Sequence, residues 1–143
     1  MKDPNRTSPL HEDAVHESAW KHVTGQALYV NDFPAPRGML VAHIVPSPVA
    51  HGRITKLDVS AAQACPGIAA VITAKDVPGE NDVSALYHDE EMLASEEVNF
   101  MGQAVALIVG ESYEACEEAA KHVVLEIEPL PAIFDVKEAI ASR

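Results

Sequence analysis

The sequence predicts a single globular domain of the α+β class, in which short strands alternate with a few short helices. Its 143 residues are enough for one domain and hardly enough for two. Hydrophobic residues make up 48% of the chain, so a genuine core is expected and global disorder is excluded. Runs with strand patterning recur along the chain, whereas only one segment carries a clear helical stripe.

The N-terminal part of the chain is polar and rich in turn-forming residues. Residues 1–15 are predicted to be a flexible arm, which leaves residues 16–143 as the folded domain. In residues 18–38, a short apolar stretch lies between Gly25 and Asn31-Asp32 and is followed by two prolines. This pattern predicts strand and loop rather than helix.

The central part of the chain predicts several strands. Residues 53–60 alternate apolar and polar side chains, as in a strand with one solvent-exposed face. A short helical stretch begins at Ser60 and is stopped by Pro66-Gly67. Buried strands are expected in residues 39–47, 68–73 and 123–131, and two more strands in residues 98–109. The loop in residues 73–97 has one short turn at its start and is long for a compact domain. It is therefore either a functional loop or a segment that packs against something outside this chain.

The clearest helix is predicted between Tyr113 and His122. Its apolar stripe is Tyr113, Cys116, Ala119, Ala120 and Val123. Acidic residues crowd its first half and Lys121-His122 close it, which matches the helix dipole. A strand-helix-strand unit therefore spans residues 104–128, and residues 135–142 start a last helix.

Charge and cysteine content exclude several function classes. Ten basic and 22 acidic residues give a net charge of -12, which argues against nucleic acid and anionic membranes as partners. No stretch is long enough for a transmembrane helix, and the N-terminus lacks the apolar segment of a secretory signal. Cys65 and Cys116 are isolated, so a reduced, cytoplasmic protein is expected, although the spacing leaves a single disulfide open.

Chemistry-bearing motifs are absent from the sequence. The seven histidines lack the spacing that would place two ligands on one helix face. The acidic residues Glu90, Glu91, Glu96 and Glu97 lack the alternating pattern and central glycine of a calcium loop, so a solvated loop face is expected. Neither a nucleotide-binding glycine loop nor a nucleophile elbow occurs. No catalytic, cofactor-binding or metal-binding residue is therefore predicted.

Gly102-Gln103 interrupts an apolar run and raises a separate question. A hairpin turn would explain Gly102, because a tight turn needs a positive φ there. A turn does not explain Gln103. Its side chain would either satisfy backbone groups at a strand end or reach across an interface.

Several stretches, in order, resemble one protein family. They are "HESAWKHVTGQALYVNDFP", "SPVAHGRI", "CPGIAAVITAKDVPGEN" and the run from "VNFMGQAVALIVGES" to "DVKEAI". Together they resemble the N-terminal α/β hammerhead domain of the molybdenum-binding large subunit of xanthine dehydrogenases and aldehyde oxidases. The motif positions Gly25, Tyr29, Asp32, His51, Arg53, Gly102 and Gln103 are the structural or interface candidates. Ala104 stands where the family often has Pro, and Gly52 where it often has Ala.

The resemblance implies a mixed sheet with flanking helices and a role in a larger enzyme. The family hydroxylates purines or aldehydes at molybdenum, and electrons leave through iron-sulfur clusters and FAD. The catalytic and molybdopterin-binding residues belong to later domains, so none is carried over to this chain. Implied partners are the remaining domains of the large subunit and the FAD and iron-sulfur subunits. The chain is accordingly expected to be a fragment or a truncated product that is not catalytic alone.

Two other classes of function stay open at this point. One is a free-standing small-molecule binding module on the same fold. The other is a small enzyme that uses His88, Glu90 or Glu91 of the long loop. A pterin-binding continuation downstream of residue 143 would favour the interface domain over both.

Overall fold

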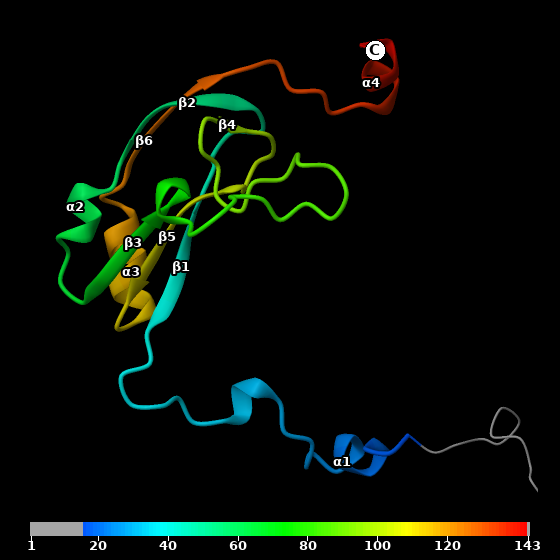
Figure 1. Ribbon diagram of the computed structural model, residues 1–143. Coiled ribbons are helices and arrows are strands. Elements are labelled where there is room, and N and C mark those ends of the chain that lie inside the picture. The colour runs from blue at the N-terminus through cyan, green and yellow to red at the C-terminus, as the bar shows by residue number, and fades with distance from the viewer. Residues whose placement is uncertain (1–15, 143) are drawn as a thin grey trace, which may run out of the picture. The chain divides into compact units, whose positions relative to one another are not determined.

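The computed structural model describes residues 16–142, which fall into two compact units, residues 16–37 and residues 38–142 (Figure 1). Residues 1–15, predicted to be a flexible arm, lie outside the described residues. The first unit holds the helix α1, Ala19–Val23, and the 3-10 helix η2, Val30–Asp32, and none of its described residues is buried.

The prediction of strand and loop without helix in the first unit is wrong. The Thr24 hydroxyl donates to the Trp20 carbonyl at 2.7 Å and closes the last turn of α1. The Asp32 carboxylate accepts from the Tyr29 amide at 2.8 Å and tightens the apolar stretch into η2. Local side-chain bonds of this kind compete with extended structure, and none of the described strands pairs with this stretch.

The second unit contains two three-stranded antiparallel sheets. In the first sheet the order is β1 (Val41–Pro46), β5 (Ala104–Gly110) and β3 (Ile68–Thr73); in the second it is β4 (Glu97–Val98), β2 (Gly52–Asp58) and β6 (Val124–Pro129). The α+β class is confirmed, but the expected mixed sheet is replaced by two antiparallel ones. The reason is that β5 and β6, on either side of the central helix, join different sheets and so form no parallel pair.

The first core lies between the β1-β5-β3 sheet and the helix α3, Tyr113–Ala120 (Figure 1). Ser112 caps α3, because its hydroxyl accepts from the Ala115 amide at 3.2 Å. Cys116 and Ala119 of the predicted stripe are fully buried and pack with Val45, Ala62, Ala106 and Ile108. The short helix α2, Ser60–Gln63, contributes Ala62. The predicted helix is therefore confirmed, and it ends two residues earlier than expected.

The second core involves the other sheet and shares β5 with the first. Val98 and Val105 are fully buried there and pack with Ala94 and with apolar side chains of β2 and β6. Because side chains alternate along a strand, Val105 enters this core while Ala106 enters the first.

Gly52 lets β6 lie close to β2. The two strands pair Gly52 with Pro129, and a Cβ atom on Gly52 would lie 2.5 Å from Ile127 Cγ2 and 2.8 Å from the Glu128 carbonyl oxygen. Gly52, which replaces the alanine that is usual in the family, therefore matters for the close packing of β2 and β6 and not for the conformation of a turn.

The remaining elements agree with the sequence. The 3-10 helix η3, Ala74–Asp76, is the expected turn at the start of the long loop, and α4, Val136–Ala141, is the last helix, capped by Asp135. Within residues 16–142, no helix has the length and apolar character needed to cross a bilayer.

Candidate interface

The Gly102-Gln103 turn links the two sheets instead of closing a hairpin. Its flanking strands do not pair with each other: β4 pairs with β2, and β5 pairs with β1 and β3. The Gly102 amide donates to the Ser47 carbonyl at 2.9 Å, and the Ser47 amide donates to the Gln103 carbonyl at 2.8 Å. Gly102 has φ 91°, so the predicted positive φ is confirmed while the hairpin is wrong.

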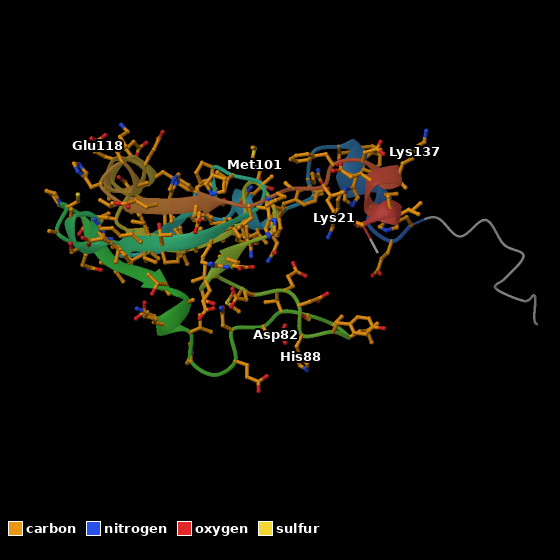
Figure 2. The ribbon with its side chains drawn as sticks, turned by 90° about the horizontal axis from the view of Figure 1, so that it is seen from above. Lys21, Asp82, His88, Met101, Glu118 and Lys137 are labelled. Atoms are coloured by element: carbon orange, nitrogen blue, oxygen red, sulfur yellow. The ribbon has the colours of Figure 1, made fainter. Side chains whose placement is uncertain are left out.

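Gln103 is a buried support for this turn. Its side chain is 4% exposed, and Oε1 accepts from the Asn99 amide at 2.7 Å. The Gln103 amide in turn donates to the Phe100 carbonyl at 3.2 Å. The result is a tightly bonded turn whose tip exposes two large apolar residues, Phe100 at 51% and Met101 at 69%. Figure 2 labels Met101.

His51 lies in a groove beside that tip. Its Nδ1 is 2.7 Å from the Pro131 carbonyl oxygen, so Nδ1 carries the proton, and in the neutral ring Nε2 stays an acceptor. The Leu130 amide donates to the His51 carbonyl at 3.0 Å, which holds the segment after β6 against β2. The groove has a volume of about 460 Å³ and an uncharged lining that includes Phe100, Met101, His51, Ile133 and Phe134. We call it the His51 groove.

Arg53 forms an exposed ion pair between strands. Its guanidinium lies 3.4 Å from the Glu97 carboxylate, across the β2-β4 pairing, and the two side chains are 58% and 43% exposed. An exposed pair of this kind contributes little stability, about 0–1 kcal/mol.

Gly25, Tyr29 and Asp32 belong to the first unit, apart from the other four candidates. The Tyr29 hydroxyl lies 2.8 Å from His22 Nδ1, and the Tyr29 amide donates to Asp32. The spacing of His22 from the other histidines argues against a metal site, and its contact with Tyr29, seven residues away at the N-cap of η2, follows no local sequence pattern.

The long loop brings together a group that the sequence did not reveal. Ligand atoms of Glu80, Asp82 and His88 all lie within 4.8 Å of one another, and Asp82 contacts His88 directly (Figure 2). Hydrogen bonds from Ser84, followed by His88, lower the pKa of Asp82 to about 2. Exposed groups of this kind often hold no ion, so no metal role is assigned to it.

Both cysteines are free thiols, as the sequence predicts. Cys116 is fully buried in the first core, and burial raises the pKa of its thiol. Cys65 is partly exposed. Cys116 therefore lacks the low pKa that marks a reactive nucleophile.

Comparisons with known proteins place the chain in one family. A family model described as "Aldehyde oxidase and xanthine dehydrogenase, a/b hammerhead domain" matches residues 24–131. The chain is 42% identical over 129 residues to xanthine dehydrogenase of Oryza sativa subsp. japonica, covering 90% of this chain and 9% of that one. It is 39% identical over 140 residues to aldehyde oxidase 4 of Mus musculus, covering 97% of this chain and 10% of that one.

Comparison with solved structures supports the same family assignment. The aldehyde oxidoreductase of Desulfovibrio desulfuricans superposes with a TM-score of 0.79 at 28% identity, over 87% of this chain and 15% of that one. The chain thus spans about a tenth of the length of these two curated relatives. The resemblance inferred from the motifs is confirmed: the chain belongs to the aldehyde oxidase and xanthine dehydrogenase family, and its fold is that family's α/β hammerhead domain.

Proposed function

We propose that residues 16–143 form the N-terminal structural and interface domain of a molybdenum hydroxylase that resembles xanthine dehydrogenase. The parent enzyme would hydroxylate purines in the cytoplasm, and this chain would not be catalytic alone. Its partners would be the remaining domains of the large subunit and the FAD and iron-sulfur subunits. The proposal rests on the family and on one feature, the rigid turn that exposes Phe100 and Met101 beside the His51 groove.

The turn has the physical character of a contact surface. Loop tips in water are usually built from small polar residues, whereas this one exposes a phenylalanine and a methionine. The buried Gln103 side chain and the bonds to Ser47 fix the turn before any partner arrives. A preformed surface loses less conformational entropy on binding than a flexible one. Gly102, Gln103 and His51 would therefore support the interface from beneath, with Phe100 and Met101 as its anchors.

The other motif positions would have related roles. Arg53 would hold the strand edge beside the groove, and Gly25, Tyr29 and Asp32 would shape the first unit for a contact of its own. All of them act through packing and hydrogen bonding, which agrees with the absence of a recognisable catalytic set in the sequence.

The His51 groove and the two cysteines do not fit the molybdopterin and the iron-sulfur clusters that the family implies. A molybdopterin phosphate requires basic side chains or a cluster of backbone amides, and the His51 groove has an uncharged lining. An iron-sulfur cluster requires several thiolates, and one of the two cysteines here is sealed in the first core. We therefore assign molybdopterin, iron-sulfur and FAD binding to other parts of the parent enzyme.

A free-standing binding module is the second candidate. The volume of the His51 groove falls within the range of small-molecule sites, which favours it. The polar side chains in its lining are His51 and Asn99, however, and the rest of the lining is apolar, whereas ligand sites usually present several convergent polar groups.

The test is reconstitution. The purified chain is mixed with a xanthine dehydrogenase large subunit that lacks its own hammerhead domain, and size-exclusion chromatography measures co-elution. We expect a one-to-one complex that Phe100→Ser with Met101→Ser weakens and that Tyr113→Ser leaves intact. Tyr113 is the matched control, because it is a similarly exposed aromatic residue on α3.

Two results would overturn the proposal. One is the failure of the unmodified chain to co-elute with the truncated subunit. The other is purine or aldehyde oxidation, or stoichiometric molybdenum, in the chain alone.

A further inference from the structure

The β1-β5-β3 sheet has a second face that α3 does not cover. Ile44, Leu107 and Ile72 are aligned across the three strands, because Leu107 pairs with Ile44 on one side and with Ile72 on the other. Their sequence neighbours Val45, Ala106 and Ile108 enter the first core under α3. By strand alternation, the aligned row therefore lies on the opposite face. Ile44 is 53% exposed there.

The long loop forms the wall of a hollow over this row. Val77, Pro78, Met92 and Leu93 line it together with the three aligned residues, and its volume is about 520 Å³. In Figure 2 the loop that carries Asp82 and His88 lies on the other side of the sheets from Glu118 of α3. The hollow is mostly apolar and larger than the His51 groove.

Asn81 holds the wall in place. Its side-chain amide donates to the Leu93 carbonyl at 2.7 Å, and the Leu93 amide donates back to Asn81 Oδ1 at 3.0 Å. The Ala94 amide donates to the Ala104 carbonyl of β5 at 2.8 Å, which ties the end of the loop to the sheet. The hollow is therefore preformed, and the family motif that ends in Asn81 acquires a physical role.

The charged side chains that line the hollow indicate which kind of partner it would bind. Asp76 and Glu80 line it, both are exposed, and no basic side chain lines it. The Asp76 carboxylate accepts from the Thr73 amide and hydroxyl, each at 2.8 Å, so its position is fixed. A second copy of the chain would bring an identical acidic rim and a further net charge of -12, and like charges in contact disfavour binding.

We propose that this hollow docks a polypeptide segment that inserts a large aliphatic or aromatic side chain and carries lysine or arginine beside it. The apolar row provides the burial, and Asp76 and Glu80 select the basic flank. This goes beyond the proposed function, which rests on the His51 groove and not on this face.

The experiment uses the full chain, labelled with ¹⁵N, and three short peptides. The first has a central Leu-Phe pair flanked by lysines, the second has the same pair flanked by glutamates, and the third has a Ser-Ser centre flanked by lysines. Titration followed by NMR measures the dissociation constant and locates the amides that shift. We expect saturable shifts at Ile44, Ile72 and Leu107 with the first peptide, and binding about tenfold or more weaker with the other two, a difference of about 1.4 kcal/mol or more.

Two variants separate the hollow from general charge attraction. Glu80→Lys should weaken the first peptide about threefold or more, whereas Glu117→Lys should leave its affinity within about twofold. Both variants replace a glutamate with a lysine, so they change the net charge equally. Glu117 is exposed on α3, on the far side of the sheet from the hollow. Ile44→Thr should also weaken binding, and it keeps a β-branched residue in the strand.

Three outcomes would overturn the inference. The first is equal binding of the lysine-flanked and glutamate-flanked peptides. The second is an equal effect of Glu80→Lys and Glu117→Lys. The third is a dimer, detected by sedimentation, that Ile44→Thr dissociates, because the hollow would then be a self-association face. The NMR spectrum of each variant shows directly whether the fold is kept.

Discussion

Gly52→Ala is predicted to destabilise this chain, even though alanine is the residue that the family often has at this position. The new Cβ would lie 2.5 Å from Ile127 Cγ2 and 2.8 Å from the Glu128 carbonyl oxygen. The methyl group can move, but the carbonyl belongs to the backbone of β6, so the strand itself must shift. Overpacking of this kind costs about 1–3 kcal/mol. Reduced freedom of the unfolded chain returns about 0.4–1 kcal/mol.

The net loss should be about 1–2 kcal/mol in the free energy of unfolding, measured by urea denaturation. For a domain of this size that corresponds to a fall in Tm of about 3–10 °C. Ile127→Leu removes the Cγ2 methyl and should recover part of the loss in the double variant, with a coupling energy of about 0.5 kcal/mol or more. A Gly52→Ala variant as stable as the parent, or a double variant without coupling, would refute the close approach of β6.

Three further predictions concern single side chains. Gln103→Ala should lower the free energy of unfolding by about 1–3 kcal/mol, because it leaves the Asn99 amide without its acceptor; a loss under about 0.5 kcal/mol in urea denaturation would contradict this. In thiol titration of the native protein, Cys65 should react first and Cys116 only on unfolding; equal rates would mean that the first core is open. The pKa of Asp82 is lowered in the folded state, so its contribution to stability is complete above the unfolded value of 3.8 and is lost as the pH falls to about 2. An NMR titration of its carboxyl group checks this, and a midpoint near 4 would argue against the hydrogen bonds that hold the loop.

Much of the local structure could be predicted from residue patterns, whereas the pairing of strands could not. The apolar stripe at Cys116 and Ala119 identifies α3, because only one helix face can meet the sheet. Apolar runs identify β1, β3 and β6 but say nothing about their partners. The hairpin around Gly102 was expected because the two strands are neighbours in sequence. β4 is only two residues long, however, and it pairs with β2. The helix α1 was missed because five residues are too few to show a stripe.

The candidate interface shows the same division. The positive φ of Gly102 could be predicted because a glycine between two apolar runs is typical of a tight turn, which needs a positive φ. The burial of Gln103 could not, since it depends on Ser47, more than fifty positions earlier. The His51 groove needs the segment after β6 to lie beside the turn at Met101, and no local pattern encodes that contact. The resemblance to a known family identified the candidate positions, whereas the contacts of each candidate residue are seen only in the structure.

The strand order has a consequence for how the chain folds as it is made. β1 and β3 each pair only with β5 among the described strands, and β2 pairs with β4 and β6. Val41 meets Gly110 and Gly52 meets Pro129, so the β1-β5 and β2-β6 pairings join residues about half the chain apart, whereas β3 and β4 find partners that are closer in sequence. The first three strands to emerge during synthesis therefore have no native pairing with one another: β1 and β3 wait for β5, and β2 waits for β4 and β6. Pairings between such distant residues form slowly, so the edges of these strands stay open to non-native contacts for longer than those of strands joined by short hairpins.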